Sequence, residues 1–137
     1  MFFNDIDQRL SGFSNSFKAT YKLEYEKRGS ITFGNAPLDY PDPGNREFKQ
    51  WHDFGGGNLY QGELNSKGEL DGRGIMVVPQ QRMMIAHFKC NTMHGPFCEI
   101  LDNGTYRIGF NRNNNLHGKL ERSYSDGQVV VEYYSEG

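Results

Sequence analysis

Hydrophobic positions in the second half of the chain recur at alternate residues, in blocks that repeat every 23 residues. Alternation with a period of two is typical of strands that bury one face. The blocks align in three columns of one parity, and the residues between them are more polar on the whole. The pattern therefore predicts half-buried strands with a shared apolar face. The columns are Tyr60, Met83, Tyr106 and Val129; Gly62, Ile85, Ile108 and Val131; and Leu64, His87, Phe110 and Tyr133.

Glycines follow the same 23-residue step at Gly72, Gly95 and Gly118. Glycine permits backbone conformations that a Cβ disfavours, so we expect one turn of each unit to pass through these residues. The pairs Asn103-Gly104 and Asp126-Gly127 favour tight hairpin turns at the other end of the unit. Each unit is then a hairpin, and the predicted whole is an antiparallel meander of six strands and part of a seventh.

The first 50 residues have a different pattern. Large apolar residues recur at steps of three and four, which predicts an amphipathic helix over residues 4–27 with Asn4 as its N-cap. The run 21–26 also alternates like a strand, so a short helix followed by a strand remains open. Residues 29–50 are rich in Pro and Gly and form a connector. The apolar positions of the helix are Ile6, Leu10, Phe13, Phe17, Tyr21 and Tyr25.

These features predict a mainly β protein with two parts. Residues 1–50 form an N-terminal helical or mixed arm and a Pro-rich connector, and residues 51–137 form a single-layer antiparallel meander of stacked β-hairpins. A chain of 137 residues is the size of one ordinary domain. We therefore expect one domain with an appended arm.

Several short motifs sit at equivalent positions of the repeat. They are Tyr60-Gln61-Gly62, Asp71-Gly72-Arg73-Gly74, His94-Gly95, Tyr106 with Asp102-Asn103-Gly104, and Leu116-His117-Gly118-Lys119 with Asp126-Gly127. With them the segment 51–137 resembles the MORN repeat, a β-hairpin unit of about 23 residues. It departs from that pattern at Met83, where a tyrosine is expected, at Ile85 and Ile108, where a glycine is expected, and at Gln81.

The resemblance implies a curved single-layer sheet with a groove lined by aromatic side chains. MORN-type proteins act chiefly as scaffolds and partner-binding modules, and some have been linked to membrane phosphoinositides. The resemblance favours a non-catalytic module that binds a helix or peptide of another protein. The side chains expected to line the binding face are Tyr60, Leu64, Tyr106, Phe110, Tyr124 and Tyr133.

Charge and cysteine content limit the classes of partner and the cellular location that we expect. The chain has 15 Lys and Arg against 17 Asp and Glu, which disfavours nucleic acid and anionic membranes as ligands. No window approaches the roughly 18 apolar residues of a membrane span, and the N-terminus lacks the basic flank of a signal peptide. Two cysteines are too few for a disulfide scaffold. We expect a cytoplasmic protein with reduced thiols.

One group of residues supports an alternative with metal or enzyme chemistry. His87, Cys90, His94 and Cys98 carry side chains that zinc accepts, and a histidine beside a thiol can activate it. However, His94 and His117 occupy the same place in the repeat, and the second has no neighbouring cysteine. The paired spacing Cys-x2-Cys is also missing. We expect no metal, cofactor or catalysis, and keep this region as the alternative.

A single-layer sheet needs a cover for its apolar face. The N-terminal helix, an external partner helix or peptide, and a second copy of the chain are all open at this point. The last predicted strand, residues 128–134, is apolar and contains no Pro or Lys that would blunt an exposed edge. This strand predicts a homodimer formed edge to edge.

Overall fold

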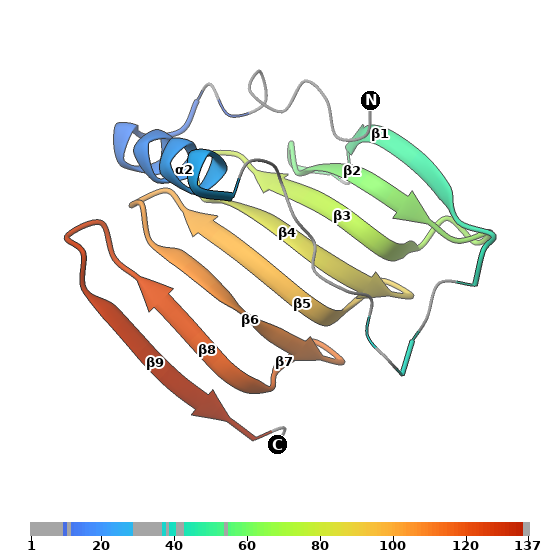
Figure 1. Ribbon diagram of the computed structural model, residues 1–137. Helices are drawn as coiled ribbons and strands as arrows, with labels where there is room; N and C mark the ends of the chain where they lie inside the picture. Colours follow the sequence, from blue (N-terminus) through green and yellow to red (C-terminus); the bar gives the residue numbers. More distant parts are fainter. Residues whose placement is uncertain are drawn as a thin grey trace.

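The computed structural model describes residues 10, 12–28, 37, 39–40, 43–53 and 55–135. These residues form one open antiparallel sheet in meander order, with a helix lying across one face near one end of the central strands (Figure 1). The predicted fold class, a mainly β single-layer meander with an N-terminal helix, is confirmed. The elements are α2 (Asn15–Arg28), β1 (Glu47–Asp53), β2 (Leu59–Leu64), β3 (Leu70–Val78), β4 (Arg82–Lys89), β5 (Thr92–Leu101), β6 (Tyr106–Arg112), β7 (Asn115–Leu116), β8 (Gly118–Ser123) and β9 (Val129–Tyr134).

The sheet is larger than the sequence pattern predicts. Its strands follow the order β1-β2-β3-β4-β5-β6-β8-β9, and the short β7 pairs with β6. The additional strand at the start, β1, begins at Glu47 within the segment expected to be a connector. The chain therefore enters the sheet before the first recognisable repeat.

Three-residue turns close the hairpins at the helix end of the sheet. In the turn between β8 and β9, Asp126 Oδ1 accepts the backbone N–H of Gln128 at 2.9 Å, and Gly127 has a φ of 91°. The turn at Asn103-Gly104 has the same arrangement. A positive φ is the conformation that glycine adopts without a steric cost. The predicted hairpin turns at these two sites are confirmed.

Asparagines, and not the repeated glycines, form the turns at the other end. Cys90–Asn91 and Asn113–Asn114 each place two consecutive residues at positive φ, as a type I′ turn requires. Gly72, Gly95 and Gly118 also have positive φ but lie within β3, β5 and β8. The predicted glycine turns are wrong, because Asn91, Asn113 and Asn114, together with Cys90, supply the turn residues with positive φ.

The two turn asparagines also join one hairpin to the preceding one. The side chain of Asn91 accepts the N–H of Leu70 at 2.7 Å, and its backbone N–H donates to the carbonyl of Leu70 at 2.8 Å. Asn114 makes the same pair of hydrogen bonds to Met93. Asn91 and Asn114 are 23 residues apart, so the same hydrogen bonds recur with the period of the repeat and join neighbouring hairpins at this end of the sheet.

The helix is capped by Ser14. Its hydroxyl accepts the N–H of Phe17 at 3.1 Å, and its own N–H donates to Asp102 Oδ1 at 2.8 Å. Thr20 adds a hydrogen bond from its hydroxyl to the carbonyl of Gly104 at 2.8 Å. Helix α2 continues through residues 21–26, so the alternative strand there is wrong. The expected cap at Asn4 and the apolar Ile6 lie outside the described residues.

Apolar side chains from the arm and the helix cover the central strands. Leu10, Phe13 and Phe17 are buried, and each contributes about 1.5–3 kcal/mol of transfer free energy. The N-terminal arm is therefore the cover over this part of the sheet. The strand residues beneath it are Ile75, Val77, Met83, Ile85, Ile100 and Tyr106.

The opposite face holds a second apolar cluster and a buried charge group. The ring of Tyr60 lies over Gly74, and its hydroxyl donates to the carbonyl of Glu63 at 3.0 Å. Farther along, the buried carboxylate of Glu99 accepts hydrogen bonds from Arg82 at 3.1 Å and from Arg107 at 2.6 Å. The cluster consists of Tyr60, Leu70, Ala86, Phe88, Phe97 and Leu120.

Candidate functional site

The cross-strand register confirms two of the predicted columns from the second unit onward. Met83 pairs with Ile100, Ile100 with Tyr106, Tyr106 with Ser123, and Ser123 with Val129. Residues directly opposite one another point to the same face of a sheet. A parallel row on this helix-side face contains Ile85, Cys98, Ile108, Glu121 and Val131.

Tyr60 lies on the other face, so the six predicted binding residues do not share one surface. Tyr60 pairs with Met76 and Met76 pairs with Met84, whereas the helix-side row contains Met83. Tyr60 is fully buried. Leu64 packs against the same opposite-face cluster. The expected common face is corrected for both residues.

A longer turn explains the correction. The loop between β2 and β3 holds residues 66–68, whereas the two later loops hold the pairs Cys90–Asn91 and Asn113–Asn114. One additional residue in a turn moves every side chain of the attached strand to the other face. The 23-residue columns thus hold where the turns have equal length, and they break at Tyr60 and Leu64.

Two further predicted residues are enclosed within the chain. Tyr106 is buried beneath the helix as part of the core. Phe110 is half-buried, and its ring packs edge-on between His94 at 6.5 Å and His117 at 6.4 Å between ring centroids. Both side chains contribute to packing, which leaves Tyr124 and Tyr133 as the exposed members of the predicted set.

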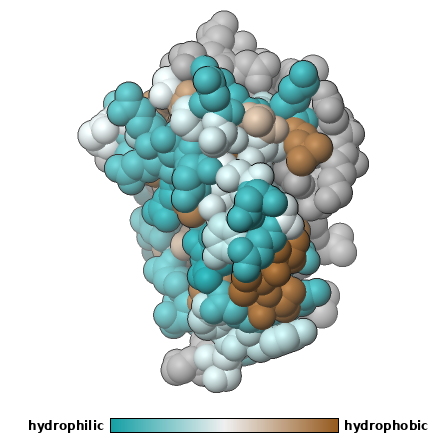
Figure 2. All heavy atoms as spheres, turned by 90° about the vertical axis from the view of Figure 1, so that its left-hand side faces the viewer, coloured by the Kyte–Doolittle hydropathy of each residue, from teal (hydrophilic) through white to brown (hydrophobic). Residues whose placement is uncertain are grey.

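An exposed apolar stripe runs along the helix-side face of β9. Val129 is 54%, Val131 42% and Tyr133 78% exposed. Figure 2, which views the molecule from the left-hand side of Figure 1, shows a compact hydrophobic patch in the lower half of the view. We call Val129, Val131 and Tyr133 the β9 stripe.

Polar residues on β8 separate the β9 stripe from the core. Val129 lies opposite Ser123, Val131 opposite Glu121, and Tyr133 opposite Lys119. Helix α2 lies over the central strands in Figure 1, and Leu10, Phe13 and Phe17 pack with residues of those strands. The β9 stripe is thus an apolar surface that the folded core does not use.

The two edges of the sheet differ in ways that matter for association. At β1, the register shifts between Lys49 and His52, and Trp51 has a φ of 42°. Exposed charges at Glu47, Lys49 and Asp53 also line that strand. By contrast, β9 pairs with β8 over six consecutive residues without a shift. Bulges and charges protect an edge from pairing, so β9 is the receptive edge.

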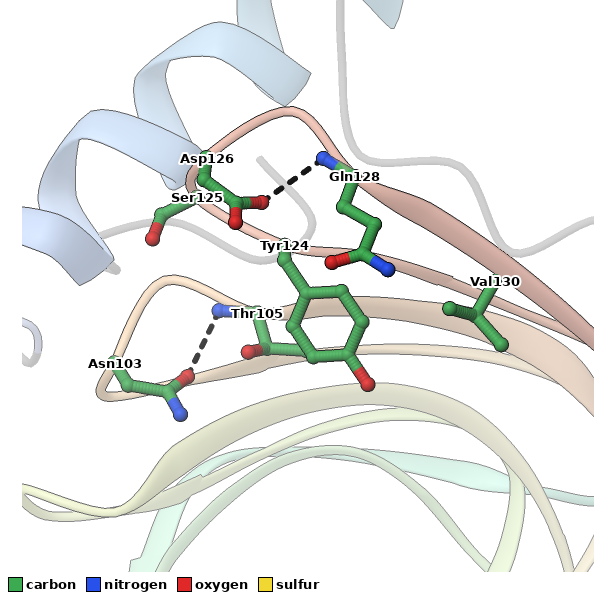
Figure 3. Close-up of a pocket in the computed structure, with 7 residues that line it drawn as sticks. All are labelled: Asn103, Thr105, Tyr124, Ser125, Asp126, Gln128 and Val130. Atoms are coloured by element: carbon green, nitrogen blue, oxygen red, sulfur yellow. Dashed lines mark hydrogen bonds between the residues drawn. The ribbon is translucent and has the colours of Figure 1, made fainter.

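Tyr124 lines a shallow open pocket at the helix end of the sheet (Figure 3). The pocket has a volume of about 390 Å³ and lies between the β5–β6 and β8–β9 turns. Its walls are mainly polar, and the ring of Tyr124 is 37% exposed. The remaining lining residues are Asn103, Thr105, Ser125, Asp126, Gln128 and Val130.

A buried carboxylate, Asp71, ties the connector to the sheet. Arg46 Nε donates to Asp71 Oδ1 at 2.7 Å, and the Tyr40 hydroxyl donates to Asp71 Oδ2 at 2.7 Å. Both Arg46 and Asp71 are nearly inaccessible to solvent. The Cys90 thiol lies 3.7 Å from Asp71 Oδ2. Burial alone would raise the pKa of Asp71, but the hydrogen bonds from Tyr40 and Arg46 outweigh it and lower the pKa.

This lowered pKa predicts acid sensitivity. A carboxyl with a lower pKa in the folded chain stabilises the fold above its ordinary value of 3.8, and this contribution is lost as pH falls through the folded pKa. We expect Asp71→Asn to flatten the acid limb of stability against pH in urea unfolding. Arg46→Met, which keeps the carboxyl but removes the cation, should move the acid loss to higher pH. Equal acid limbs in all three proteins would contradict the assignment.

The four residues of the alternative metal site have separate environments. His94 is buried, with Nε2 2.9 Å from Asp39 Oδ1 and Nδ1 accepting the N–H of Asn113 at 3.2 Å. The hydrogen bond from His94 lowers the pKa of Asp39. His87 is buried, Cys90 is exposed and Cys98 packs against the core. Within the described part of the chain, no three His, Cys, Asp or Glu side chains are grouped to hold a metal ion.

Comparisons with known proteins do not assign the chain to a family. No protein-family model matches it, and no curated protein matches its sequence. The MORN resemblance therefore rests on the repeat residues alone. Of the helices in the described ranges, none has the length and apolar character needed to cross a membrane.

Val129 and Val131, which are exposed, are not among the predicted binding residues, although they belong to the predicted columns. The residues of β8, the preceding strand, indicate that these side chains are exposed. Ser123 and Glu121 precede them in the cross-strand rows and are polar. An apolar strand beyond a polar one cannot extend the core, so its hydrophobic side chains need another cover.

Proposed function

We propose that this protein is a non-catalytic binding module of the scaffold type, which docks an apolar helix or peptide of a partner protein on the β9 stripe. The observation that carries this proposal is the exposure of Val129, Val131 and Tyr133 on one face of an edge strand. Contiguous apolar surface of this kind marks interaction sites in folded proteins. The balanced charge of the chain supports a protein partner over nucleic acid or a membrane.

Tyr133 is the expected anchor of the interaction. Its ring has the largest exposed fraction of the large hydrophobic side chains described, and tyrosine is enriched among residues that dominate binding energy. Tyr124 borders a pocket that Val130 also lines, and Val130 points to the face opposite the β9 stripe, so Tyr124 is not part of the proposed docking surface. We further propose a cytoplasmic location, which the two free cysteines support.

Substitution of the anchor tests the proposal. A partner is first captured from native extract and identified by mass spectrometry, and its affinity is then measured by calorimetry with purified proteins. Tyr133→Ser should weaken binding by about 2 kcal/mol, or roughly thirtyfold. Phe48→Ser is the matched control, because Phe48 is an exposed aromatic residue on the opposite edge strand. Unchanged affinity for Tyr133→Ser, in a protein with wild-type circular dichroism, would overturn the proposal.

A further inference from the structure

We infer that the outer edge of β9 pairs antiparallel with β9 of a second copy of this chain, with Val131 opposite Val131 of that copy. The pairing joins two β9 stripes into one apolar platform. This inference rests on the proposed function, because it describes the assembly that presents the docking surface.

The backbone of β9 is arranged for such a pairing. Tyr124 donates its N–H to the carbonyl of Gln128 at 2.8 Å, which sets the phase of the β8–β9 hydrogen bonds. Along a strand of an antiparallel pair, residues alternate between directing their backbone N–H and C=O groups toward the partner strand and directing them away from it. Even-numbered residues of β9 therefore face β8, and Val129, Val131 and Tyr133 direct their N–H and C=O groups outward. Among the strands that the structure describes, none pairs with that outer edge.

The sequence of β9 is complementary to itself in one register. With Val131 on the two-fold axis, Val129 lies opposite Tyr133 of the second copy, an aromatic and β-branched pair that stabilises antiparallel sheets. Val130 then lies opposite Glu132. A register centred on Glu132 would place two carboxylates face to face, which is unfavourable. Glu132 already forms an ion pair with Arg122 of its own chain.

The same register keeps the two stripes on one side. Residues opposite each other in antiparallel strands point to the same face, so Val129, Val131 and Tyr133 of both copies form three adjacent cross-strand pairs. Hydrogen bonding at the edge does not cover these side chains. The platform that results has twice the apolar surface of one stripe and remains open to a partner helix.

The opposite edge of the sheet explains why assembly stops at two copies. A β9 strand that paired with β1 would repeat head to tail and form an open fibre. The register shift between Lys49 and His52, together with the positive φ of Trp51, bends β1 away from straight pairing. Pairing of β9 with β9 is symmetric and leaves no free copy of the receptive edge.

Sedimentation equilibrium of the full chain at high micromolar concentration tests the inference. The wild type should have twice the monomer mass of 15.7 kDa. Val131→Lys places like charges across the two-fold axis and should give a monomer in low salt. Phe48→Lys, on the β1 edge, should remain dimeric. A monomeric wild type, or a dimer that only Phe48→Lys disrupts, would overturn the inference.

Cysteine cross-linking tests the register without a change of charge. In a Cys90→Ser, Cys98→Ala background, Val131→Cys should form a disulfide-linked dimer under mild oxidation, because residues in a hydrogen-bonded pair have Cα atoms about 5.5 Å apart. Val130→Cys should cross-link far less, since its opposite residue is Glu132. Equal cross-linking at both positions would show that β9 does not pair in this register.

The outcomes separate this inference from the proposed function. A monomer whose partner affinity depends on Tyr133 would retain the docking function on the β9 stripe and overturn only the dimer. A dimer whose partner affinity is unaffected by Tyr133→Ser would retain the dimer and overturn the docking function.

Discussion

Gly74→Ala is expected to lower the free energy of unfolding by about 3 kcal/mol, the upper part of the range for overpacked cores. A Cβ at this position would overlap the buried ring of Tyr60. The ring cannot move aside easily, because its hydroxyl is bound to the carbonyls of Glu63 and Arg73. Urea unfolding followed by circular dichroism measures the loss. Gly12→Ala is the control, since open space surrounds Gly12, and it should change stability by less than about 0.5 kcal/mol.

A double-mutant cycle identifies the cause of that loss. Tyr60→Ala alone should cost about 3–5 kcal/mol through the cavity that it leaves. If Gly74 is required only to make room for the ring, Gly74→Ala should add almost nothing in the Tyr60→Ala protein. Additive losses would instead mean that Gly74 is needed for its own backbone, and the proposed ring contact would be wrong.

Phe17→Ala should destabilise the protein by about 3–5 kcal/mol, because it opens a cavity between the helix and the sheet. Phe17 is fully buried, and its ring stacks on Phe13 with centroids 4.0 Å apart. Urea unfolding gives the total loss, and amide hydrogen exchange shows whether α2 detaches first. Leu23→Ala on the same helix is the control, since Leu23 is 61% exposed. Equal stability of the two variants would contradict the role of the helix as a cover.

The sequence pattern predicts the strands from β4 onward, because the turns that separate them keep the 23-residue step. It misplaces β2, where the turn at residues 66–68 is one residue longer. Periodicity cannot reveal such a change, because the repeated glycines begin at Gly72 and none of them precedes this turn. The sequence pattern does not predict the turns at Cys90–Asn91 and Asn113–Asn114, because glycine is the residue most typical of positive φ.

The exposure of the candidate binding residues could not be predicted from the sequence pattern. Tyr106 and Tyr133 belong to columns of equal apolar character, yet one is 6% and the other 78% exposed. The difference comes from the N-terminal arm and helix, which cover the central strands and leave β9 open. Which strands a distant segment covers depends on tertiary packing, and the alternation of apolar residues along a strand carries no information about it.

The hydrogen bonds between Ser14 and Asp102 join residues 88 positions apart. During synthesis from the N-terminus, at about 5–20 residues per second, the helical segment precedes Asp102 by several seconds. Phe13 and Phe17 pack with residues of β3, β4 and β5, so the surface beneath them is incomplete until β5 has been made. The helix is therefore synthesised first, but it can make its contacts with Ile100 of β5 and with Asp102 only after these residues have been added to the chain.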